Sequence, residues 1–171
     1  GASADMADER PHIWRHYVVG ANVYMPALLG SPEKAELARE RLAHAATLSV
    51  SPELNGKNLA GFTVRVANDG AGHMLPTGVT EFRQMWIEAK VTDAKGKTAF
   101  SSGVVGSDAR LPSGTRVFQT VFGDSEGKPT INVARAARIL TDRRIPPKGW
   151  CDEAFRLDKP LKPPVTVTVE L

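Results

Sequence analysis

The chain has 171 residues, of which 42% are hydrophobic and 24% are charged, and its formal net charge is +3. This length and composition fit a single globular domain with a hydrophobic core, and they exclude a disordered chain. No apolar run is long enough to cross a membrane, and the basic residues are scattered without interleaved aromatics, so we expect neither a transmembrane segment nor a nucleic-acid partner.

The first structured segment is predicted to be helical, over residues 20–50. Ser31 is a suitable N-cap, Pro32 suits the first helical position, and Glu33 complements the positive end of the helix dipole. Alanines and leucines then recur at helical spacing, which predicts an amphipathic helix that ends near Leu48. We therefore expect residues 1–50 to form an N-terminal arm with helices.

From residue 60 onward the hydrophobic period changes to two, which indicates β-strands. Short alternating runs are separated by turns rich in glycine, proline and aspartate: "GFTVRVAND", "QMWIEAKVTD", "KTAFSSG", "TRVFQTVFGD" and "PVTVTVEL". This pattern predicts a mainly β fold, an antiparallel, immunoglobulin-like β-sandwich over residues 51–171 that packs with the arm as one structural domain. The run "INVARAARIL" is compatible with a helix or with a strand.

The segment "NDGAGHMLPTG", residues 68–78, carries a candidate functional side chain. Its three glycines allow conformations with positive φ, so His73 is expected on a constrained loop at a sheet edge, where rigid scaffolds often present functional groups. Met74 beside it is a possible soft ligand for Cu(I), but a side chain that fills a gap in the core is the favoured interpretation. Without a functional role, His73 would cap a turn or bond a neighbouring carbonyl.

A second candidate segment is "PHIWRH", residues 11–16. On a helix His12 and His16 would share one face, and in an extended chain Trp14 would join them on one side. Either geometry is competent to bind a metal, because imidazole is a common ligand of copper, zinc, nickel and haem iron. A pair of surface or packing histidines is the alternative.

Other chemistry-bearing residues give weaker signals. The single cysteine, Cys151, excludes an internal disulfide and a CxxCH haem attachment, and we interpret it and Trp150 as packing residues in a loop. No serine lies in a nucleophile elbow, no glycine-rich loop has P-loop spacing, and no carboxylates pair at a spacing that suggests acid and base roles. An enzyme is therefore the less favoured class.

The motifs "RPHIWRHYVVGANVYMPALLG", "GAGHMLPTG" and "RIPPKG" resemble the haem-free C-terminal region of bacterial multihaem c-type cytochromes, from Arg10 to Leu171. The resemblance implies a β-domain beside haem domains in an electron-transfer protein. Because this chain has no CxxCH, it would act as a structural or docking module, or supply histidines to haem c in a neighbouring domain or chain.

A related resemblance is to methanotroph surface copper-binding proteins of the MopE and CorA type. Those proteins hold copper with two histidines and a tryptophan oxidised to kynurenine, which precedes the first histidine by two residues. Carried over, Trp14 is the candidate kynurenine, and His16 and His73 are the candidate copper ligands, with His12 and Met74 as further donors. Both resemblances imply export to the periplasm or the cell surface.

The sequence thus supports two functions. The first is an exported metal-binding protein with a mononuclear copper site, Cu(I) or Cu(II), between the N-terminal arm and the "GHMLPTG" loop. The second is the non-haem module of a multihaem cytochrome, whose partner is a cytochrome domain or another redox protein.

Overall fold

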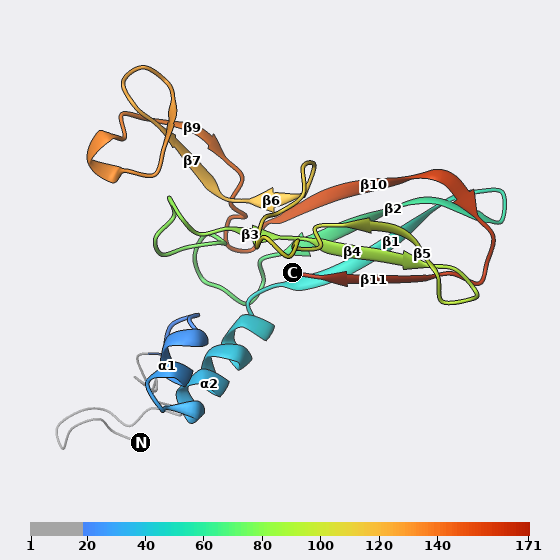
Figure 1. The fold of residues 1–171 in the computed structure, drawn as a ribbon, viewed down its shortest axis with the longest axis horizontal. Helices are drawn as coiled ribbons and strands as arrows, with labels where there is room; N and C mark the ends of the chain where they lie inside the picture. Colours follow the sequence, from blue (N-terminus) through green and yellow to red (C-terminus); the bar gives the residue numbers. More distant parts are fainter. Residues whose placement is uncertain (1–18) are drawn as a thin grey trace. The chain divides into compact units, whose positions relative to one another are not determined.

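The computed structural model describes residues 19–171, and these form two compact units that meet in sequence between Ala43 and His44. The first unit holds the helices α1 (Tyr24–Leu28) and α2 (Pro32–Ala43) (Figure 1). Pro32 and Glu33 open α2 as predicted, and the Ser31 hydroxyl donates to the Glu33 carboxylate. Ala35 and Ala38 supply the buried face of α2.

The second unit consists of four antiparallel sheets (Figure 1). The sheets β1-β2-β10 and β11-β4-β5, of three strands each, form its body. A third three-stranded sheet, β8-β7-β9, and the two-stranded sheet β3-β6 complete the unit. The strands are β1 (Thr47–Asn55), β2 (Asn58–Ala67), β3 (Met85–Trp86), β4 (Glu88–Thr92), β5 (Thr98–Ser102), β6 (Val117–Phe118), β7 (Thr120–Gly123), β8 (Pro129–Thr130), β9 (Arg138–Asp142), β10 (Trp150–Leu161) and β11 (Thr166–Glu170).

The core lies between the sheets β1-β2-β10 and β11-β4-β5. Alternate residues of β2 face inward and are fully buried, because β2 is the central strand of its sheet, and β4 does the same in the other sheet. Stacked and edge-to-face phenylalanine rings from β2, β5 and β10 fill the space between the sheets. The buried cluster comprises Leu59, Phe62, Val64, Val66, Ile87, Ala89, Val91, Phe118, Ile145 and Phe155. The predicted mainly β antiparallel sandwich, preceded by helices, is confirmed.

The predicted end of the helix near Leu48 is wrong. Helix α2 ends at Ala43, and Leu48 lies in β1, where it pairs with Val66 and packs against the core. The turn that joins β1 to β2 contains Gly56 at a φ of +62°, a conformation that glycine adopts without strain. The pairing of residues 47–55 with the central strand β2 thus outweighs the helical spacing of alanines and leucines, which favoured a longer helix.

The run that the sequence left undecided contains both kinds of structure. A short 3₁₀ helix, η1 (Val133–Arg135), is capped by Asn132, whose side chain accepts a hydrogen bond from the Ala134 N–H. Strand β9 then pairs with β7. The loop position predicted for Trp150 and Cys151 is wrong, because both residues open the long strand β10, whose pairing with β2 begins at Trp150 and Ala67.

Candidate functional site

The loop that carries His73 is anchored at its start by Asn68. Asn68 is fully buried, and its side-chain Nδ2 donates to the carbonyl oxygens of His73 (2.8 Å) and Ile145 (2.9 Å). Leu75 and Ile145 then exchange two backbone hydrogen bonds, of 2.9 and 2.6 Å. The loop is therefore constrained as predicted, because hydrogen bonds hold it at His73 and again at Leu75.

The His73 ring is exposed, and its hydrogen bonding decides which nitrogen can bind a ligand. Nδ1 lies 3.0 Å from the Met74 carbonyl oxygen, an acceptor without protons, so Nδ1 must carry the hydrogen. In the neutral ring Nε2 then keeps its lone pair and points away from this bond. Metal-ligating histidines are commonly fixed by the same second hydrogen bond. A bond to a neighbouring carbonyl is also what the sequence predicts for a His73 without a functional role. The same bond leaves Nε2 as one oriented nitrogen donor at the surface.

Of the other predicted ligands, only Met74 lies within the described residues. Met74 is half-buried, and its carbonyl oxygen is the group that orients the His73 ring. His12, Trp14 and His16 lie outside the described residues. Within residues 19–171 no group of three or more His, Cys, Asp or Glu side chains could hold a metal ion. One imidazole fits a metal or a haem iron only as one ligand among several, the rest coming from elsewhere.

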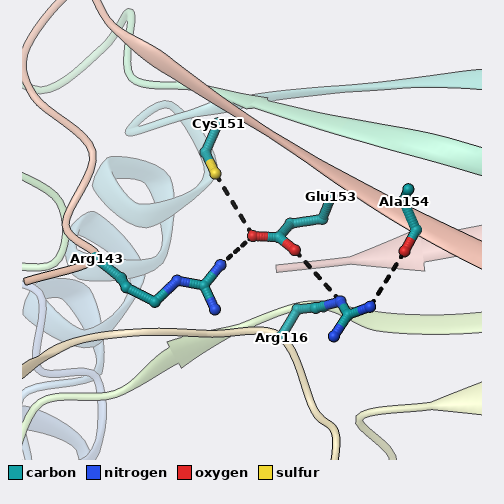
Figure 2. A network of polar contacts seen from close by, with 5 residues as sticks. All are labelled: Arg116, Arg143, Cys151, Glu153 and Ala154. Atoms are coloured by element: carbon teal, nitrogen blue, oxygen red, sulfur yellow. Dashed lines mark hydrogen bonds and ion pairs between the residues drawn. The ribbon is translucent and has the colours of Figure 1, made fainter. Parts of the chain in front are cut away.

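A charged cluster centred on Glu153 was not predicted from the sequence (Figure 2). Glu153 is a core-facing residue of β10 and is only 9% exposed. The Arg143 guanidinium donates a hydrogen bond to Glu153 Oε1 and forms an ion pair with it. Arg116 Nε lies 3.3 Å from Glu153 Oε2. Arg116 also donates to the Ala154 carbonyl oxygen (3.3 Å). Two cations thus compensate one buried carboxylate, as a buried charge requires.

Cys151 belongs to the same cluster. Its thiol donates to Glu153 Oε1 at 3.5 Å, and burial together with the nearby Glu153 carboxylate raises the pKa of Cys151. The thiol therefore stays protonated, which disfavours a role as nucleophile or metal ligand. The cluster ties β10 to the segments before β6 and after β9, so its geometry is that of a structural link.

Next to the His73 loop, the start of β10 presents exposed side chains. Trp150 is 60% exposed, and the Arg65 guanidinium lies 5.2 Å from the centre of its ring. Arg65 is held in place by two hydrogen bonds of 2.7 Å to Asp152. The interpretation of Trp150 as a packing residue is wrong, because most of its side chain is exposed. Its partner in β2 is Ala67, which alternates with the buried Val66.

No protein-family model and no curated protein matches the chain. Among solved structures, the chain is similar to a penta-heme cytochrome c552 from Thermochromatium tepidum, with a TM-score of 0.55 and 18% sequence identity. The match covers 69% of this chain and 29% of that one, so the chain spans less than a third of the cytochrome's length. At this identity the likeness extends to the fold alone.

The comparison supports one of the two resemblances at the level of fold. A multihaem cytochrome contains a region folded like this chain, whereas the resemblance to methanotroph copper proteins gains no support. In the described part of the chain no helix is long and apolar enough to span a membrane.

Proposed function

We propose that this chain is a haem-free β-module of an exported multihaem cytochrome system, located in the periplasm or at the cell surface. In this role His73 supplies an imidazole nitrogen to a haem iron held by a neighbouring domain or chain. The observation that carries the proposal is the hydrogen bond from His73 Nδ1 to the Met74 carbonyl oxygen, which leaves Nε2 as an exposed donor. The shared fold with a penta-heme cytochrome supports the choice of iron.

The fixed position of the loop suits His73 to bind a metal that is held by another domain or chain. A surface donor is useful to an external centre only if its position is fixed, because a mobile side chain loses conformational entropy on binding. The Asn68 amide and the backbone bonds between Leu75 and Ile145 fix the His73 main chain. Ligation by His73 needs no further ligand from residues 19–171, in which no complete metal site is present.

The proposal is tested with a ferric haem-c peptide that has one axial histidine and an open sixth position. We expect the full chain to convert this peptide to the low-spin form, seen by Soret absorption and electron paramagnetic resonance. His73→Ala should weaken the conversion at least tenfold, whereas His44→Ala, which removes a histidine from another segment, should not. Conversion that survives His73→Ala but is lost in His16→Ala contradicts the assignment.

Copper is the second candidate, because the same Nε2 nitrogen of His73 suits Cu(I) or Cu(II). This function needs His16 as the second ligand, Trp14 as kynurenine and His12 or Met74 as further donors. Elemental analysis and intact mass of protein purified without a nickel column decide the matter. One copper per chain that is lost in both His16→Ala and His73→Ala, and failure to bind the haem peptide, would establish the copper site instead.

A further inference from the structure

Three exposed side chains of different chemistry lie on two segments that are hydrogen-bonded to each other: His73, Lys148 and Trp150. The Lys148 N–H donates to the Asn68 carbonyl oxygen, and the Asn68 N–H donates to the Gly149 carbonyl oxygen, both at 2.8 Å. The β2–β3 connection thus leaves the β1-β2-β10 sheet at the end where β10 begins (Figure 1). Both segments therefore lie at this end of the sheet.

Trp150 provides an apolar surface at this end of the sheet. A tryptophan that is 60% exposed leaves a large apolar ring in water, and such rings commonly mark binding surfaces. Arg65 lies over the ring and is itself fixed by Asp152, so the indole is held in one orientation. A flat apolar ligand is the natural partner of a flat, oriented ring.

Lys148 provides a positive charge beside this ring. Its φ of +59° is in the left-handed region, which disfavours a side chain with a Cβ, and the turn is closed by a 2.9 Å bond from the Gly149 N–H to the Pro146 carbonyl oxygen. Within residues 19–171 the ammonium group of Lys148 makes no ion pair. It is therefore available to an anionic group of a ligand.

We propose that this end of the sheet is a docking surface for a haem group exposed by a partner domain. Haem combines three features that these side chains match: an iron that takes an imidazole nitrogen, a flat apolar ring, and propionate carboxylates. His73 would ligate the iron, Trp150 would contact the ring, and Lys148 would pair with a propionate. The inference rests on the proposed function and adds the residues that select haem over a bare metal ion.

The test uses the full chain and the same ferric haem-c peptide. Trp150→Ala should weaken binding roughly five- to tenfold, because it removes the apolar contact. Lys148→Asn keeps a residue that tolerates positive φ and removes the charge, so it should weaken binding about threefold and reduce the salt dependence. Lys159→Asn and Leu54→Ala, exposed residues at the other end of the sheet, serve as matched controls.

A second peptide isolates the role of the propionates. When its propionates are converted to methyl esters, wild type and Lys148→Asn should bind with equal affinity, while Trp150→Ala remains weaker. Loss of binding in His73→Ala, with Trp150→Ala and Lys148→Asn equal to wild type, overturns this inference and leaves the proposed function standing. Absence of any low-spin complex with the wild-type chain overturns both.

Discussion

At the scale of single residues, Asn68 decides the position of the His73 loop. It is fully buried, its Nδ2 serves two carbonyl oxygens, and both its backbone groups bond to the turn before β10. A small polar side chain with two donors is needed here, because a buried carbonyl oxygen without a donor costs free energy. One asparagine therefore connects its own loop to residues 145–149, a segment that is distant in sequence.

We predict that Asn68→Ala lowers the free energy of unfolding by about 2 kcal/mol, since it removes two hydrogen bonds made by a buried amide. The His73 carbonyl oxygen loses its donor, and the Ile145 carbonyl oxygen keeps only the Leu75 N–H. Urea denaturation measures this loss. Asn132→Ala is the control: Asn132 is exposed and accepts one hydrogen bond, so its loss should be less than half as large. Equal losses in the two variants would show that burial of Asn68 is not decisive.

The loop position of His73 could be predicted from the sequence because the residues around it are typical of a loop. The glycines of "NDGAGHMLPTG" indicated a constrained loop, and the structure shows His73 exposed on such a loop. Of the three glycines only Gly78 has a positive φ, and the loop is held by Asn68. The Glu153 cluster could not be predicted in this way. Its arginines are 37 and 10 residues distant, and a glutamate on an inward-facing strand position is recognised only when strand β10 and its register are known.

At the scale of elements, two glycines with similar backbone angles have different roles. Gly103, after β5, has a φ of +74°, and a Cβ there would lie 2.2 Å from the Ile87 carbonyl oxygen. Gly96, in the turn between β4 and β5, has a φ of +76° and open space where a Cβ would point. The first position requires glycine for conformation and for space, and the second requires it for conformation alone.

Gly103→Ala should therefore lower the free energy of unfolding by about 3 kcal/mol, because backbone atoms must shift to admit the methyl group. Gly96→Ala should cost about 1 kcal/mol, from the positive φ alone. Thermal unfolding of the two variants gives the comparison. A Gly103→Ala variant as stable as Gly96→Ala would mean that the β5 end can move away from Ile87 at little cost.

Strands β2 to β7 and β11 were predictable because alternation and turn residues coincide in them. Strand β10 was not predicted, and its first residues, Trp150 and Cys151, were expected in a loop. Strand β1 was missed, since eight of its nine residues are exposed and it carries no clear alternation of burial. The local signal for β1 was the dipeptide Asn55-Gly56, which favours a tight hairpin turn. The end of the helix was also misplaced. Leu48 pairs with β2, and this long-range pairing cannot be predicted from the helical spacing of nearby residues.

At the scale of the whole molecule, several carboxylates make stability depend on pH. Hydrogen bonds from Arg144 lower the pKa of Asp142 from 3.8 to about 2, and backbone N–H groups and Arg65 lower the pKa values of Asp93 and Asp152 respectively. A lowered folded-state pKa contributes stability above the unfolded-state pKa, and this contribution is lost as the pH falls through the folded-state value. The fold should therefore weaken between about pH 4 and pH 2.

Asp142→Asn should lower the free energy of unfolding at pH 7 by about 1 kcal/mol. This is less than the full pKa shift implies, since the side chain is 29% exposed and solvent screens the pair. The loss of stability between pH 4 and pH 2 should become smaller in this variant. Urea denaturation across that range tests it, and Asp158→Asn, an exposed residue, should leave the pH dependence unchanged.

The central position of β2 has a consequence for how the sandwich is assembled. β1 comes directly before β2 in the sequence, but β10 begins at Trp150, long after β2 ends at Ala67. At ribosomal speeds of about 5 to 20 residues per second, the second partner of β2 emerges roughly 4 to 17 s after β2 itself. During this interval β2 has one unpaired edge, because β10 has not yet been made. The β1–β2 hairpin is then only marginally stable, as isolated hairpins are. Folding of the sandwich is therefore a late event that depends on closing a long loop, and a nascent chain halted before residue 150 carries an open edge.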